Sequence, residues 1–202
     1  MSRRIGILGG SFDPVHAAHL ALAKAAADAF ALDEVRLMPC AQQALKRRRP
    51  APAEDRCALL RLALADDPRL TLDCRELWRA GATYTIDTVL ELRRELPEAA
   101  LWFILGMDSV VDFPRWRRAR ELVGLCAFIA FDRPGVEPPA EPFDPRLLAH
   151  RLRGPRMDLS STDIRAAVAN GAAMRYPINE FEARYLRAKA LYHEGTPHEA
   201  DH

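Results

Sequence analysis

The segment GGSFDPVHAAH at residues 9–19 constrains the fold more than any other part of the sequence. It follows a short apolar stretch, residues 5–8, which is typical of a buried β-strand. Gly9 and Gly10 predict a tight turn and a close approach of the backbone to a ligand, because neither residue carries a Cβ atom. The chain therefore starts with a strand that runs into a glycine turn.

A helix is expected directly after this turn. Pro14 stands where a helix can begin, and the alanine-rich stretch of residues 15–30 continues it. His16 and His19 are three residues apart, so they share one face of the first helical turn. Free backbone N–H groups at a helix N-terminus bind anions, and two imidazoles beside them can stabilise a phosphoryl group. The protonation states of both histidines are left open, since a free imidazole has a pKa of about 6.5.

Composition places the chain among soluble globular proteins. Of its 202 residues, 49% are hydrophobic and 28% are charged. The formal net charge of +1 gives no general attraction to nucleic acid or to anionic membranes, so neither is expected as a partner. The cysteines form no C-x-x-C pair, which argues against a zinc or redox motif, and no signal peptide or membrane span is recognisable. We therefore expect a cytoplasmic protein.

Apolar runs and helical patterns alternate along the chain. Strands are expected at residues 5–8, 34–38, 70–73, 101–105 and 127–131. Helices are expected at residues 15–30, 54–65 and 85–96. Such alternation predicts an α/β fold, a Rossmann-like doubly wound parallel sheet with flanking helices and a small C-terminal helical part. We expect one domain over residues 1–194 and a disordered tail over residues 195–202.

A second polar motif, LSSTDIR at residues 159–165, predicts another helix start. Ser160 and Asp163 have the spacing of a capping box, which by itself indicates only an ordinary helix N-terminus. Ser161 and Thr162 add hydroxyls beside free backbone N–H groups, and Arg165 lies on the same face of the helix. Hydroxyls, amides and a guanidinium that converge on one point suit a chain of phosphates.

Both motifs resemble those of a known superfamily. GGSFDPVHAAH is similar to the G-x-F-D-P-x-H-x-G-H motif of the HIGH-type nucleotidyltransferases, with Ala18 in place of the usual glycine. LSSTDIR resembles the I-S-S-T-x-x-R motif of the same superfamily. Four segments between them, ATYT at 82–85, GMDS at 106–109, FPRW at 113–116 and RPG at 133–135, resemble elements of the bacterial nicotinate-nucleotide adenylyltransferases.

This resemblance implies a reaction. Nicotinate mononucleotide and ATP would give nicotinate adenine dinucleotide and pyrophosphate, a step of NAD biosynthesis. It implies Mg²⁺ carried on the ATP phosphates, with no metal site of the protein's own, because Mg²⁺ keeps several waters. ATP and nicotinate mononucleotide are then the expected partners, and a homo-oligomer is compatible with the sequence.

The resemblance also assigns the site residues. The catalytic groups would be His16, His19 and Arg165. ATP would be bound by Gly9, Gly10, Ser11, Phe12, His19, Gly106, Asp108, Ser161, Thr162 and Arg165. Nicotinate mononucleotide would be bound by Lys46, Tyr84, Thr85, Trp116 and Arg133. Lys46 departs from the family context, since the chain reads QALK where P-P-H-K is frequent.

Two other interpretations stay open. The same chemistry would serve nicotinamide mononucleotide or another phosphorylated acceptor, such as phosphopantetheine. A protein of this fold that binds a nucleotide or RNA without turnover belongs to a different class. The intact His16, His19 and Arg165 argue against that class, because a pure binder has less need of both imidazoles.

Overall fold

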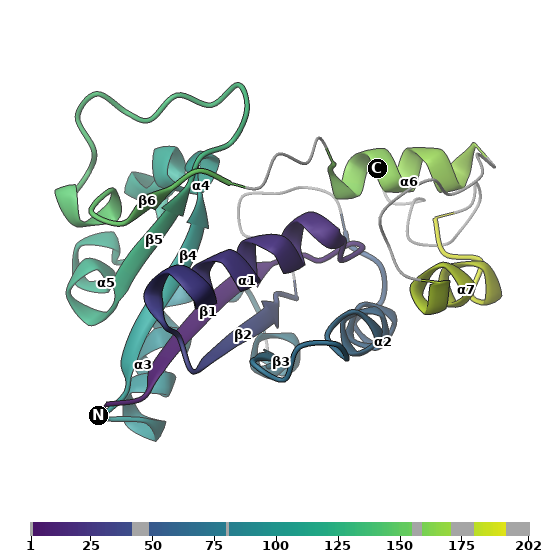
Figure 1. Ribbon diagram of the computed structural model, residues 1–202, viewed down its shortest axis with the longest axis horizontal. Coiled ribbons are helices and arrows are strands. Elements are labelled where there is room, and N and C mark those ends of the chain that lie inside the picture. Colours follow the sequence, from purple (N-terminus) through teal and green to yellow (C-terminus); the bar gives the residue numbers. More distant parts are fainter. Residues whose placement is uncertain (1, 42–48, 80, 155–158, 171–179, 193–202) are drawn as a thin grey trace.

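One parallel sheet organises the chain in the computed structural model, which describes residues 2–41, 49–79, 81–154, 159–170 and 180–192 (Figure 1). The strands are β1 (Arg4–Gly10), β2 (Glu34–Pro39), β3 (Leu70–Leu72), β4 (Ala100–Gly106), β5 (Ala127–Phe131) and β6 (Arg151–Leu152). The helices are α1 (Ala17–Phe30), α2 (Ala53–Ala63), α3 (Thr85–Glu95), α4 (Met107–Asp112), α5 (Ala119–Leu125), α6 (Ser161–Ala169) and α7 (Glu180–Ala188). Short 3₁₀ turns lie at Arg75–Trp78, Phe113–Arg115 and Pro145–Leu147.

The strand order is β3-β2-β1-β4-β5-β6, and every neighbouring pair is parallel. Sequence order runs outward from β1 in both directions, so it reverses between β1 and β4. Ligands in such sheets bind at the carboxyl ends of the strands at this switch point. The predicted Rossmann-like doubly wound sheet is therefore confirmed, and the ends of β1 and β4 mark where a ligand is expected.

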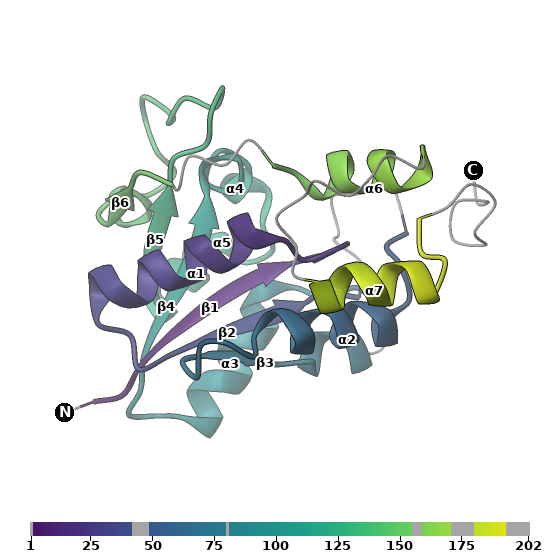
Figure 2. The ribbon, with the colours of Figure 1, turned by 45° about the vertical axis from the view of Figure 1, so that its right-hand side comes forward.

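Helices cover both faces of the sheet. Apolar side chains of α1, α2, α6 and α7 pack into one buried cluster, and those of α3, α4 and α5 pack into a second cluster on the other face. In Figures 1 and 2, α6 and α7 lie beyond the tip of β1, with α7 beside α2. The Tyr185 hydroxyl of α7 donates to Asp55 Oδ1 of α2 at 2.8 Å. The small C-terminal helical part therefore sits at the carboxyl end of the sheet.

The predicted glycine turn is wrong. Gly9 and Gly10 continue β1 and lie in register with Met38 and Pro39 of β2. Pairing with the neighbouring strand keeps this backbone extended, and the chain turns only at Phe12, which adopts a positive φ of 45°.

The predicted helix start is also displaced. Pro14 is not the first helical residue, because α1 begins at Ala17 after His16. The carbonyl groups of Asp13 and Pro14 accept hydrogen bonds from α6 instead, which holds this stretch outside the helix. The backbone N–H of His16 donates to His19 Nδ1 at 3.3 Å, and this hydrogen bond caps the N-terminus of α1 at His16.

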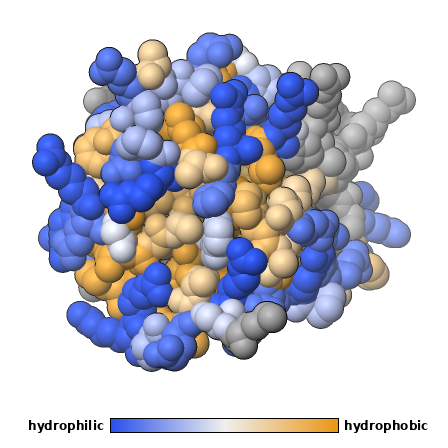
Figure 3. Space-filling view, turned by 60° about the vertical axis from the view of Figure 1, so that its left-hand side comes forward, coloured by the Kyte–Doolittle hydropathy of each residue, from blue (hydrophilic) through white to orange (hydrophobic). Residues whose placement is uncertain are grey.

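One face of the molecule carries apolar side chains. Figure 3 shows apolar side chains in the middle of one face, with hydrophilic side chains around them. Large exposed apolar residues in the described chain, such as Trp78 and Phe181, belong to separate elements, and single exposed apolar side chains are ordinary. Within the described residues, the helices are too short or too polar to cross a membrane.

Candidate active site

The two histidines stand together at the start of α1. Their rings are stacked, with centroids 3.8 Å apart, and Phe12 packs edge-on against His19 at 5.0 Å. His16 is only 6% exposed, and its Nδ1 atom has no hydrogen-bond partner among the residues that the structure describes. A buried ring nitrogen without a partner costs free energy, so this atom is suited to a ligand.

The protonation of His16, which the sequence leaves open, follows from its surroundings. Burial, and secondly the positive charge of Arg133, lowers the pKa of His16 to about 4, although Asp163 opposes the shift. His16 is therefore neutral at neutral pH. A neutral imidazole carries one N–H donor and one acceptor, so it can donate to a phosphoryl oxygen without bringing a full charge.

The second motif docks onto the first. Ser161 Oγ donates to the Pro14 carbonyl at 2.9 Å, and Arg165 Nη1 donates to the Asp13 carbonyl at 2.6 Å. Arg165 Nη2 donates to Thr162 Oγ1 at 3.1 Å. Ser160 caps α6, as predicted, by accepting from the Asp163 N–H. Two motifs about 150 residues apart in sequence thus form one cluster.

The side chain of Asp13, which sequence reasoning overlooked, anchors the same turn. It is 3% exposed, and its Oδ1 accepts from the Ala51 N–H at 3.0 Å and from the Tyr192 hydroxyl at 2.7 Å. The loop after β1 is thereby fastened to the loop before α2 and to the chain beyond α7. A buried carboxylate with such donors positions the backbone rather than meeting a ligand.

Arg56 is a second residue that sequence reasoning missed. It is 1% exposed, and its guanidinium donates to the carbonyl groups of Ser11, Cys40 and Ala51 at 2.7, 2.8 and 2.9 Å. It therefore ties the ends of β1 and β2 to the start of α2. The helical spacing did indicate that Arg56 is buried, because it precedes the buried Leu59 by three residues and shares its helix face.

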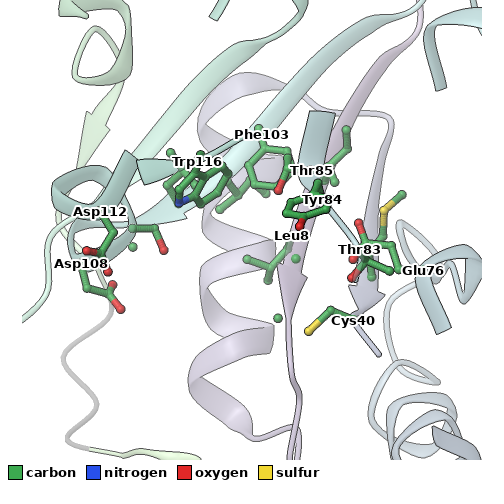
Figure 4. Close-up of a pocket in the computed structure, with 18 of the residues that line it drawn as sticks. Leu8, Cys40, Glu76, Thr83, Tyr84, Thr85, Phe103, Asp108, Asp112 and Trp116 are labelled. Carbon is green, nitrogen blue, oxygen red and sulfur yellow. The ribbon is translucent and has the colours of Figure 1, made fainter. Parts of the chain in front are cut away.

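A cavity of about 470 Å³ opens at the carboxyl ends of β1 and β4 (Figure 4). Several predicted site residues line it: Gly9, Gly10, Tyr84, Thr85, Gly106, Asp108 and Trp116. In Figure 4, Asp108 and Asp112 lie at one end and Glu76 and Thr83 at the other, with Trp116 between them. The cavity is therefore elongated, and its two ends differ in the groups that they offer.

Trp116 is held by two phenylalanines. Its ring stacks on Phe113 at a centroid distance of 5.1 Å and meets Phe103 edge-on at 5.9 Å. The indole is half-buried and lines the cavity, so part of its surface faces a ligand. A fixed indole surface favours stacking with a flat aromatic ring.

The start of α3 contributes backbone donors opposite this indole. Tyr84 is the N-cap residue and Thr85 the first helical residue, as predicted, and both line the cavity. The Arg117 guanidinium lies 4.6 Å from the centroid of the Tyr84 ring and also lines the cavity. Free N–H groups, a hydroxyl and a nearby cation together favour a carboxylate.

Glu76 is a further cavity residue that the sequence did not reveal. It accepts a hydrogen bond from Thr88 Oγ1 at 2.6 Å. Burial raises the pKa of Glu76 above its ordinary value, although the Thr88 hydrogen bond and Arg79 oppose the shift. Its hydrogen bond from α3 fastens the 3₁₀ turn of residues 75–78 to the helix that supplies the backbone donors.

Arg133 and Asp108 form an ion pair at 2.8 Å between partly exposed side chains. Arg133 is therefore placed beside a residue predicted to bind ATP, and it is not among the residues that line the cavity. Asp108 does not cap α4; its Oδ1 lies over Gly106, where an added Cβ would stand 2.5 Å from it. A Cβ atom at position 106 would require the exposed Asp108 carboxylate to move.

The other predicted residues divide into two groups. Ser11, Phe12, His16, His19, Ser161, Thr162 and Arg165 lie outside the cavity lining and form the cluster around the β1–α1 turn. Lys46 lies outside the described residues, as does the tail at 195–202. Within the described part of the chain, no group of three or more His, Cys, Asp or Glu side chains is placed to hold a metal ion.

Comparison with known proteins identifies the family of this chain. The Cytidylyltransferase-like family model matches residues 7–167. A protein of Herpetosiphon aurantiacus named "Probable nicotinate-nucleotide adenylyltransferase" is 40% identical over 195 residues, which cover 94% of this chain and 98% of that protein. A protein of Aeromonas hydrophila with the same name is 41% identical, over 93% of this chain and 96% of its own.

Solved structures agree in fold. Nicotinic acid mononucleotide adenylyltransferase of Plasmodium falciparum, complexed with NaAD, superposes with a TM-score of 0.78 at 21% identity, over 94% of this chain and 97% of that chain. The same enzyme complexed with APC gives a TM-score of 0.75 at 20% identity, again over 94% and 97%. Together with the sequence matches, this shows that the chain belongs to the nicotinate-nucleotide adenylyltransferase family, within the cytidylyltransferase-like proteins.

Proposed function

We propose that this protein transfers the adenylyl group of ATP to nicotinate mononucleotide, giving nicotinate adenine dinucleotide and pyrophosphate. The observation that carries the proposal is a cavity that joins Trp116 and the start of α3 to the end of β1. A pyridine nucleotide and an adenine nucleotide laid along it would meet beside the His16–His19 pair. Family membership supports the same reaction.

Transfer needs no covalent intermediate with the protein. A phosphate oxygen of the mononucleotide attacks the α-phosphorus of ATP in line, and the bond from that phosphorus to the pyrophosphate oxygen breaks. Catalysis then consists of positioning and of stabilising charge on the α-phosphoryl oxygens. We assign that stabilisation to His16 and His19, because His16 is neutral and keeps a buried ring nitrogen without a described partner.

The leaving pyrophosphate is assigned to the start of α6. Ser161, Thr162 and Arg165 stand together there, and Arg165 is 17% exposed. Its guanidinium is already fixed to the Asp13 carbonyl, so less side-chain entropy is lost when it binds phosphate. The rest of ATP is assigned to Gly9, Gly10, Ser11, Phe12, Gly106 and Asp108, with Gly106 and Asp108 at the adenosine.

The nicotinate mononucleotide is assigned to Tyr84, Thr85, Trp116, Lys46 and Arg133. Trp116 would stack on the pyridine ring, and the start of α3 would receive the carboxylate. Arg133 lies at the Asp108 end of the site, so we assign it to the phosphate side of the mononucleotide rather than to the ring.

Mg²⁺ fits this site as an ion carried by the nucleotide. The described residues offer no cage of carboxylates, whereas Mg²⁺ is usually held by substrate phosphates, one or two carboxylates and several waters. When bound, the ion would neutralise part of the charge on the triphosphate.

Arg165→Ala is expected to raise the KM for ATP and to lower kcat, because the charge that develops on pyrophosphate loses its guanidinium. Arg165→Lys should restore only part of the loss, since an ammonium cannot replace the planar fork. Steady-state kinetics of pyrophosphate release with varied ATP tests this. If Arg165→Ala left both parameters unchanged, α6 would be structural only.

Acid selectivity is expected to come from the start of α3. Nicotinate and nicotinamide present the same ring to Trp116, so stacking does not distinguish them. Buried donors left facing an amide N–H₂ cost about 1–3 kcal/mol, and a charged acceptor strengthens the bonds that remain. We therefore expect kcat/KM for the acid to exceed that for the amide by at least about tenfold.

The matched control is Trp116→Ala, which should weaken both mononucleotides by a similar factor, about 1–3 kcal/mol of stacking, and leave their ratio unchanged. Pyrophosphate release measured with ATP and a panel of acceptors tests the whole proposal. The panel contains nicotinate mononucleotide, nicotinamide mononucleotide and phosphopantetheine. A preference for either of the last two, or no release with any of them, would overturn the assigned substrate.

A further inference from the structure

Two cysteines that the proposed reaction does not use lie side by side. Cys57 belongs to α2, and Cys74 follows β3 and precedes the 3₁₀ turn at Arg75–Trp78. Their Sγ atoms are 3.0 Å apart, and both residues are free thiols. Cys57 is 3% exposed, whereas Cys74 is half-buried and therefore open to a small molecule on one side.

We propose that Cys57 and Cys74 form a redox modification site, at which hydrogen peroxide converts the two thiols into an intramolecular disulfide. A disulfide bond is about 2.05 Å long, so the two sulfur atoms need to approach by only about 1 Å. The residues are 17 positions apart, on helix α2 and on the segment after β3, and α2 packs against β3. The remaining cysteines, Cys40 and Cys126, are buried.

The reaction balances with one equivalent of peroxide. The Cys74 sulfur attacks one peroxide oxygen, the O–O bond breaks, and a sulfenic acid and one water result. Cys57 Sγ then attacks that sulfur, the S–S bond forms, and the departing hydroxide takes the thiol proton as the second water. Two thiols are oxidised by two electrons in total, and one peroxide is reduced to two waters.

Peroxide is expected to react first with the Cys74 thiol, and this reaction is expected to be slow. Burial, and then the hydrogen bond with Cys57, raises the pKa of Cys74 to about 12. Thiolate is therefore scarce at neutral pH, and the thiolate is the nucleophile. The pair is expected to respond to sustained peroxide exposure rather than to a brief pulse.

The link would join the helix that carries Arg56 to the segment that leads to Glu76. Cys57 follows Arg56, which holds the carbonyl groups of Ser11, Cys40 and Ala51. Cys74 lies two residues before Glu76, which lines the cavity. A disulfide across a loop of this length also removes entropy from the unfolded chain. Oxidation is therefore expected to raise the melting temperature by roughly 5 °C or more.

The experiment treats the full chain with hydrogen peroxide, blocks remaining thiols with iodoacetamide and maps the peptides by mass spectrometry. A peptide pair joined through Cys57 and Cys74, with the loss of two hydrogen atoms and reversal by dithiothreitol, supports the proposal. The melting temperature of the same samples should rise on oxidation and return on reduction.

Three variants sharpen the result. Cys57→Ser and Cys74→Ser should each abolish the linked peptide and the shift in melting temperature, while Cys126→Ser, which removes a buried thiol elsewhere, should keep both. Circular dichroism of the reduced proteins checks that each variant folds. The proposal is overturned if folded wild-type protein yields no Cys57–Cys74 link, if another pair forms, or if Cys74 proceeds to sulfinic acid. None of these readouts depends on adenylyl transfer.

Discussion

Replacing His19 by alanine is expected to lower turnover by about 10²–10³-fold, the range for the loss of one transition-state donor. His19 stacks on His16 and accepts a hydrogen bond from the His16 N–H, so it lies at the proposed phosphoryl site and fixes its neighbour. ATP affinity should change far less, because the nucleotide keeps its contacts at the start of α6. Steady-state pyrophosphate release gives kcat, and equilibrium titration with ATP gives the affinity.

The informative control for this variant is His150→Ala. His150 packs against Phe30 and Trp102, far along the chain from the cluster at the start of α1. The His150→Ala variant also removes a histidine side chain, but it should keep wild-type turnover. Near wild-type turnover of folded His19→Ala would contradict the catalytic assignment.

Arg56→Ala is expected to cost about 3 kcal/mol or more of unfolding free energy. The change leaves three buried carbonyl groups without their donor and opens a cavity below the loops that follow β1 and β2. Urea unfolding followed by circular dichroism gives the free energy. Turnover of the folded fraction should fall as well, since Ser11 loses its anchor.

Arg61→Ala serves as the matched control, because Arg61 lies on the exposed side of the same helix. Substitutions of exposed residues usually change stability by less than about 0.5 kcal/mol. A similar small change for Arg56→Ala would mean that the three carbonyl groups find water or other donors at little cost.

Most of the sheet could be predicted from the sequence. The apolar runs at 101–105 and 127–131 correspond to β4 and β5, because fully buried parallel strands read as continuous hydrophobic stretches. Local patterns failed where a distant partner decided the conformation. Gly10 is extended because it pairs with β2, and Pro14 lies outside a helix because α6 binds the adjacent carbonyl groups.

The residues of the candidate site could likewise be predicted only in part. Motif residues such as His16, Thr85 and Arg165 could be found because their spacing repeats that of a family. Arg56, Asp13 and Tyr192 could not, because charged residues and tyrosines are ordinarily taken to face solvent, and their buried partners lie far away in sequence. Asp13 accepts a hydrogen bond from the Ala51 N–H, and the sequence around Ala51 contains no recognisable motif.

The hydrogen bond between Tyr192 and Asp13 can form only late in the synthesis of the chain. The two residues are 179 positions apart, so a ribosome that adds about 5–20 residues per second makes the second roughly ten to forty seconds after the first. Throughout that interval the nascent chain holds the Asp13 carboxylate without its hydroxyl donor. A chain that ends between Arg165 and Tyr192 keeps every side chain proposed as catalytic and still lacks the hydrogen bond that seats the Asp13 turn.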